Sequence, residues 1–87
     1  MYLITENIPY EGSTVYGVFD HPKTFLEIYI DKVLNSPAEK EAETKVESTS
    51  IKDDTIMIRF TSKFRGTHTK FTLAFHAQVI TLNELIN

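Results

Sequence analysis

Two segments in the second half of the chain alternate between apolar and polar residues, and this pattern restricts the fold more than any other feature. In residues 55–62 one face carries large apolar side chains, which are Ile56, Ile58 and Phe60. In residues 69–81 the residues in phase are Phe71, Leu73, Phe75, Ala77 and Val79. Such alternation is typical of strands that bury one face of a sheet. A chain with two such strands needs another element to cover the apolar face.

A helix that begins at Pro22 supplies this cover. Proline suits the first helical position, and the residue before a proline avoids helical geometry, so His21 is expected to lie outside the helix. The apolar residues recur at helical spacing on one stripe, which consists of Phe25, Leu26, Tyr29, Ile30 and Val33. This stripe and the two strand faces together predict a core of Phe25, Tyr29, Ile30, Ile58, Phe60, Leu73 and Phe75.

The beginning of the chain predicts a hairpin. Residues 1–6 and 13–19 are rich in β-branched and aromatic side chains, and a short turn separates them. Gly17 lies inside the second of these strands, which indicates a bulge or close packing against the helix.

The segment after the helix has two interpretations. Residues 35–43 form either a linker or a short second helix, because Ser36 to Glu39 matches a capping box but the segment has little apolar surface. A polar strand is expected over residues 44–52. A loop over residues 63–68, with a glycine at its tip, joins the last two strands.

These elements predict one α+β domain over residues 1–87, in the order ββαβββ. The strands form an antiparallel sheet, and the one main helix packs on one of its faces. A second capping-box pattern at residues 81–84 predicts a helical turn near the end of the chain.

Side chains with catalytic or ligating chemistry are sparse. The chain has no cysteine, which excludes disulfides and thiolate ligands. The three histidines lack metal-binding spacing, and the three glycines form neither a P-loop nor a dinucleotide fingerprint. We therefore expect a non-enzymatic binding module with no catalytic residue, metal site or cofactor. The opening residues lack a secretory pattern and no apolar run approaches membrane-spanning length, so we expect a cytoplasmic location without membrane contact.

Charge is divided unevenly along the chain. Residues 1–54 contain eleven acidic and five basic residues, a net charge of −6. Residues 55–87 contain one acidic and four basic residues, a net charge of +3. Either two halves of a mixed surface differ by chance, or one part of the domain faces a partner of opposite charge.

The basic residues of the second half gather around the expected loop. The candidate binding residues are Arg59, Lys63, Phe64, Arg65, His68 and Lys70. An aromatic side chain between cations can stack on a base beside bound phosphate, or it can anchor a protein interface. The alternatives are that Phe64 packs onto the core and that the cations are ordinary surface residues. The isoelectric point of about 5.5 disfavours general nucleic-acid binding.

The first part of the chain, up to about residue 35, resembles small bacteriophage and prophage proteins in which a hairpin passes directly into a helix. The matching residues are Tyr10, Glu11, Gly12, Gly17, Val18 and Phe19. The resemblance implies an accessory protein of a mobile element, a class that includes inhibitors of host defence enzymes. It implies no catalytic residue.

The leading functional expectation is a phage-type accessory protein that inhibits a host protein or protein–nucleic acid complex, such as an anti-CRISPR-like inhibitor of a defence nuclease. The first alternative is a small nucleic-acid-binding domain that uses the basic hairpin at residues 63–70. The second is a structural homo-oligomer, because the polar residues 44–52 leave the last strand partly unpaired, and an uncovered edge favours a homodimer. We expect the interface at residues 63–70; the competing surface is the acidic segment of Glu39, Glu41 and Glu43, acting as a DNA mimic.

Overall fold

The computed structural model describes residues 1–8 and 10–81 of the chain. Its elements follow the predicted order, with one short helix added. In chain order they are β1 (Tyr2–Ile8), β2 (Gly12–Phe19), α1 (Pro22–Leu34), α2 (Pro37–Glu41), β3 (Lys45–Lys52), β4 (Thr55–Phe64) and β5 (Thr67–Val79). α1 begins at Pro22 as predicted, and the backbone N–H of Lys23 donates a 3.0 Å hydrogen bond to Nδ1 of His21.

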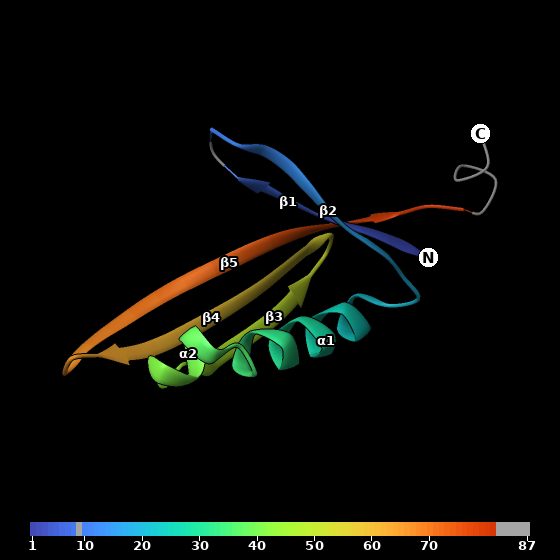
Figure 1. The fold of residues 1–87 in the computed structure, drawn as a ribbon. Helices are drawn as coiled ribbons and strands as arrows, with labels where there is room; N and C mark the ends of the chain where they lie inside the picture. The colour runs from blue at the N-terminus through green and yellow to red at the C-terminus, as the bar shows by residue number, and fades with distance from the viewer. Residues whose placement is uncertain (9, 82–87) are drawn as a thin grey trace.

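The strands form one antiparallel sheet in the order β2-β1-β5-β4-β3. α1 packs against one face of this sheet, and α2 follows it near the start of β3 (Figure 1). Among the described residues, the opposite face carries no helix. The predicted α+β architecture is therefore confirmed.

The core lies between α1 and the sheet, and its buried members are Ile4, Phe25, Leu26, Ile56, Ile58, Phe60, Phe75 and Ala77. Four of the predicted core residues are buried, namely Phe25, Ile58, Phe60 and Phe75. The other three predicted residues are half-buried and pack against this cluster, namely Tyr29, Ile30 and Leu73. Phe75 is central, because its ring centroid lies 5.0 Å from that of Phe25 and 4.9 Å from that of Tyr29.

Burial on β5 ends before the alternation does. Val79 is in phase with Phe75 and Ala77, but it is 68 % exposed, whereas Ile80 is buried. Alternation predicts the direction in which a side chain points, but not whether another element covers it. At the end of this strand, a residue's place in the alternation therefore does not predict whether it is buried.

Two connections differ in length from the simplest sequence interpretation. Residues 37–41 form α2, so the segment 35–43 is not a plain linker. β4 extends to Phe64 and β5 begins at Thr67, so a two-residue turn replaces the expected loop over residues 63–68. The turn residues Arg65 and Gly66 have φ angles of 51° and 82°, the geometry of a type I′ hairpin turn. The helical turn predicted at residues 81–84 falls almost entirely outside the described residues.

A bulge shapes the first hairpin. Ile4 pairs with Gly17 and Thr5 pairs with Val15, so Tyr16 has no opposite residue. Gly17 has a φ angle of 136°, which favours glycine, and the bulge predicted there is confirmed. The Tyr16 ring packs against the core, with its centroid 5.4 Å from that of Phe75.

β5 is paired over different stretches on its two sides. β4 pairs with it from Thr67 to His76, whereas β1 pairs with it only from His76 to Val79. Beyond Thr5, β1 pairs with β2 alone, and the hairpin leaves the sheet as one arm of a fork (Figure 1). The expected unpaired edge of the last strand is present, but it results from the departure of β1 and not from the polarity of β3.

Candidate functional site

Cationic side chains from three strands converge on the sheet face that α1 does not cover. On β4, Arg59 and Lys63 alternate with the buried apolar residues, so they point to the opposite face. The strand register places His68 opposite Lys63, and it places Thr61 opposite both Lys45 and Lys70. We call this surface the basic face, and its residues are Lys45, Arg59, Lys63, His68 and Lys70.

Sheet geometry keeps these side chains close together. Neighbouring strands lie about 4.8 Å apart, and residues on the same face of one strand lie about 7 Å apart. Lys45 and Lys70, on either side of Thr61, are therefore roughly 10 Å apart at the backbone. Hydroxyl groups lie between the cations, on Ser48, Thr61 and Thr72. A strip with permanent positive charges and hydroxyl donors suits phosphate oxygens.

A hollow of about 290 Å³ opens on this face near the hairpin tip. Its lining residues are Glu43, Lys45, Thr61, Ser62, Lys63 and His68. The backbone N–H of Lys63 donates a 2.6 Å hydrogen bond to the carbonyl of Ala42, which ties β4 to the end of α2. The hollow is therefore lined by two lysines and a histidine, together with the carboxylate of Glu43.

Three acidic side chains reduce the positive charge of the basic face, and one of them, Glu43, lines the hollow. Glu47 lies in a bulge of β3, and its Oε1 is 3.5 Å from Lys70 Nζ. Asp54, farther along the face, places Oδ2 3.1 Å from His76 Nε2. The Glu47–Lys70 pair is open to solvent, where an ion pair contributes about 0–1 kcal/mol. A phosphate can therefore compete with Glu47 for Lys70.

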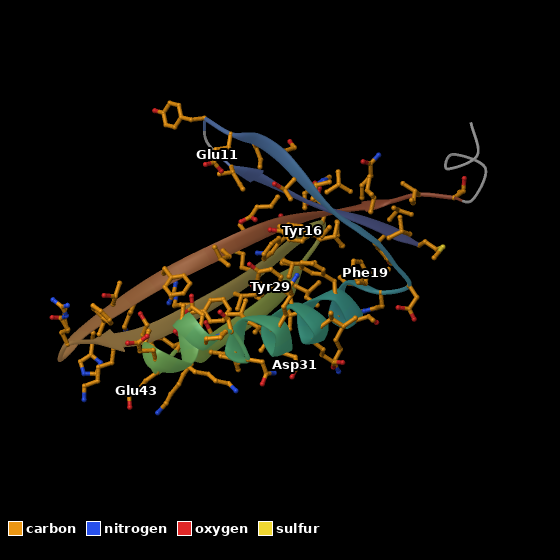
Figure 2. All side chains as sticks on the ribbon, viewed as in Figure 1. Glu11, Tyr16, Phe19, Tyr29, Asp31 and Glu43 are labelled. Atoms are coloured by element: carbon orange, nitrogen blue, oxygen red, sulfur yellow. The ribbon has the colours of Figure 1, made fainter. Side chains whose placement is uncertain are left out.

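Four of the eleven acidic residues in the first half lie on the two helices. They are Glu27, Asp31, Glu39 and Glu41, and the same helices also carry Lys23, Lys32 and Lys40. Figure 2 shows Asp31 on the side of α1 that faces away from the sheet. Glu39 is partly buried, and its Oε2 accepts a 2.5 Å hydrogen bond from the hydroxyl of Thr44. The four acidic and three basic residues of the helices give them a net charge of −1, so the charge division along the chain becomes only in part a division between two faces.

Four of the six candidate residues lie on the basic face, namely Arg59, Lys63, His68 and Lys70. Sequence reasoning did not include Lys45, which belongs to a polar strand with no distinctive local pattern. Only the pairing of β3 with β4 brings Lys45 beside Thr61. The polarity of residues 44–52 could have indicated that this strand contributes to the site, because an exposed strand still places every second side chain on the open face.

The other two candidate residues, Phe64 and Arg65, form the hairpin tip. Phe64 alternates with Lys63, so it points to the helix side and not onto the basic face. It is 54 % exposed, and Arg65 Cζ lies 5.3 Å from its ring centroid. The alternative in which Phe64 packs onto the core is therefore wrong, and the tip presents a stacked aromatic–arginine pair.

A second concave surface lies on the helix side and has a volume of about 510 Å³. We call it the aromatic groove, and its lining includes Tyr16, Phe19, Tyr29, Val33, Ser36 and Glu39. Figure 2 shows Tyr16 and Tyr29 between the first hairpin and α1. The groove therefore combines aromatic walls with two charged residues of opposite sign, Lys32 and Glu39.

Burial and the neighbouring carboxylate of Glu6 both favour the protonated form of the groove's two tyrosines. The Tyr16 hydroxyl donates a 2.6 Å hydrogen bond to Glu6 Oε1. Burial, followed by this hydrogen bond and the charge of Glu6, raises the pKa of Tyr16 above its ordinary value. Burial and then the charge of Glu6 also raise the pKa of Tyr29. An ordinary tyrosine is already neutral near pH 7, so the raised pKa values of Tyr16 and Tyr29 delay ionisation only at alkaline pH.

Within residues 1–8 and 10–81, no group of three or more His, Cys, Asp or Glu side chains is arranged to hold a metal ion. In the same described part of the chain, no helix has the length and apolar character needed to cross a membrane. No protein-family model, curated protein or solved structure matches this chain.

Proposed function

We propose that the chain is a non-enzymatic, cytoplasmic nucleic-acid-binding domain that contacts the phosphate backbone through the basic face. The supporting observation is the convergence of Lys45, Arg59, Lys63 and Lys70, from three strands, on one helix-free face. Phosphate contacts need positive charge and hydrogen-bond donors, and they require no base-specific pocket. The net charge of −3 is compatible with this function, because most acidic residues of the helical segment lie on the other side.

Two charge-matched variants test the proposal. The first replaces Arg59, Lys63 and Lys70 with alanine, and the second replaces Lys23, Lys32 and Lys40, which lie on the helices. Each variant is titrated, by fluorescence anisotropy, into a labelled single-stranded DNA oligonucleotide and into the same sequence as a duplex. We expect the first variant to weaken binding at least about tenfold, or about 1.4 kcal/mol, and the second to bind almost normally. An equal loss in both variants would mean that net charge, and not this face, determines binding.

The second candidate function is the inhibition of a host protein, as the phage resemblance implies. The stacked pair of Phe64 and Arg65 favours it, because exposed aromatic and arginine side chains frequently anchor protein interfaces. A hairpin tip can also enter a partner's cleft without disturbing its own sheet.

The variant Phe64→Ala/Arg65→Ala separates the two functions, because it removes the stacked pair and leaves the basic face intact. The wild-type chain and this variant are used in pull-downs from host lysate, with and without nuclease. A protein that the wild type retains after nuclease treatment and the variant loses supports inhibition of a host protein. Retention that disappears with nuclease supports nucleic-acid binding.

A further inference from the structure

The fork between β1 and β5 leaves a stretch of β5 with an open edge. The N–H of Ala77 donates a 2.8 Å hydrogen bond to the carbonyl of Asp54, so the odd-numbered residues of β5 direct their backbone groups toward β4. The even-numbered residues therefore direct their N–H and C=O groups toward the other edge. β1 occupies that edge only from His76 onward. Among the described residues, four positions on this edge have no strand partner, and they are His68, Lys70, Thr72 and Ala74.

Two chemically different surfaces flank this open edge. On one side is the basic face, to which His68 and Lys70 contribute. On the helix side, Phe71 and Leu73 are half-buried and point in the direction of the core. The aromatic groove is nearby, since Tyr16, which lines it, packs 5.4 Å from Phe75, the next residue along this strand face.

We propose that this edge receives an extended segment of a partner protein in which apolar and acidic residues alternate. An added strand pairs its backbone with the open groups of β5, and every second side chain then points to the same face. The side chains on the helix side meet Phe71, Leu73 and the aromatic groove, so they are apolar. The side chains on the other side lie beside His68 and Lys70, so charge complementarity selects acidic residues.

The dimensions of the edge set the length of the partner segment. Residues 68–74 span about 24 Å at about 3.4 Å per residue, which accommodates a strand of about seven residues. This proposal is separate from nucleic-acid binding, because its main contacts are backbone groups of β5. The nucleic-acid proposal uses side chains on the open face.

A designed peptide tests the proposal directly. The probe is the acetylated, amidated peptide Glu-Val-Glu-Val-Glu-Val-Glu, and one control carries lysine in place of every glutamate. A second control, Glu-Glu-Val-Val-Val-Glu-Glu, has the same composition without alternation. We expect only the alternating acidic peptide to bind and to slow hydrogen exchange at the amides of His68, Lys70, Thr72 and Ala74. Equal binding of the non-alternating peptide, or protection confined to β2 or β3, would overturn the proposal.

Two substitutions in the protein locate the contact. Thr72→Pro removes an N–H that points to the open edge and leaves the hydrogen bonds to β4, whereas Thr72→Ala keeps that N–H. We expect at least tenfold weaker peptide binding for Thr72→Pro and normal binding for Thr72→Ala. Because a proline can also disturb folding, Lys70→Glu provides a second test that keeps every backbone N–H group of the open edge. It should reverse the preference from the acidic peptide to the lysine peptide, and an unchanged preference would overturn the proposal.

Sedimentation distinguishes a peptide from a second copy of the chain. Two copies paired through this edge would bring the cations of both β5 strands together, so we expect the wild-type protein to remain a 10.0 kDa monomer without peptide. A homodimer that Thr72→Pro dissociates and Thr72→Ala does not would assign the edge to self-association and would overturn the peptide proposal. Oligonucleotide binding should persist in Thr72→Pro, because the cations of the basic face are unchanged.

Discussion

Lys70 Nζ lies 3.5 Å from Glu47 Oε1, although β4 separates the two strands that carry these residues. The bulge in β3 places Glu47 near this lysine and puts a negative charge within the basic face. Glu47→Gln should therefore free Lys70 for phosphate and raise affinity for single-stranded DNA by up to about fivefold, since an exposed ion pair contributes about 0–1 kcal/mol. Glu41→Gln makes the same charge change on α2 and serves as the control. Anisotropy measures the affinity, and a gain of equal size in both variants would contradict a local effect.

Phe75→Ala should lower the free energy of unfolding by about 3–5 kcal/mol. Phe75 is 2 % exposed, and its ring packs against those of Phe25 and Tyr29 from α1. Removing the ring opens a cavity between the helix and the sheet, and such a loss is a large share of a small domain's stability. Urea denaturation measures the change. A Phe75→Ala protein with the wild-type midpoint would show that this residue is not central to the core.

The predictable part of the fold rested on strong periodicity. Residues 55–62 and the apolar stripe of α1 each specify one face, so burial of residues such as Phe60 and Phe25 followed from pattern alone. The turn at Arg65 and Gly66 was expected as a longer loop, because alternation weakens where the strands leave the core and become exposed on both faces.

The features of the fold that the sequence did not predict depend on the register in which the strands pair. A bulge at Glu47 determines which residues of β3 share a face with Arg59, and no local pattern in that polar segment reveals it. The bulge at Tyr16 lies where β1 leaves β5, and Gly17 indicated the bulge but not the fork. The place of Lys45 on the basic face and the open edge of β5 could therefore be found only from the structure.

Tyr16→Phe should make the free energy of unfolding fall less steeply as the pH rises into the alkaline range. Burial and Glu6 raise the pKa of Tyr16 above its ordinary value of 10.0, so the folded state holds the phenolic proton more tightly than the unfolded state. This stabilisation is complete below about pH 10 and is lost as the pH rises above that value. Phenylalanine has no proton to lose, so the variant's unfolding free energy should fall less steeply. Denaturation at a series of alkaline pH values tests this. If the unfolding free energies of the wild type and the variant fall in parallel with pH, the prediction is contradicted.

Phe64→Ala should cost little stability, less than about 1 kcal/mol, because more than half of the side chain is already exposed. Its effect on DNA affinity should also be small, since the ring points away from the basic face. Thermal unfolding and anisotropy on the same preparation measure both quantities. A loss of several kcal/mol would show that the tip packs onto the core.

Replacing Lys63, Phe64 and Arg65 together with alanine should abolish binding to a host protein if the tip is the contact surface. Reversal of the charges of Glu39, Glu41 and Glu43 is the comparison, and it should leave that binding intact. Pull-down of a nuclease-resistant partner by each variant distinguishes the two surfaces. If the tip variant binds and the charge-reversed variant does not, the acidic segment is the interface and acts as a DNA mimic.

The salt dependence of DNA binding tests the basic face most directly. The logarithm of the association constant falls linearly with the logarithm of salt concentration, by about 0.7 for each phosphate neutralised on a single strand. The four Lys and Arg residues of the basic face, Lys45, Arg59, Lys63 and Lys70, therefore predict a slope of about −3. Replacing Arg59, Lys63 and Lys70 should make the slope shallower by about 2, while replacing Lys23, Lys32 and Lys40 should leave it unchanged. A slope near zero for the wild type, or an equal change in both variants, would contradict phosphate binding on this face.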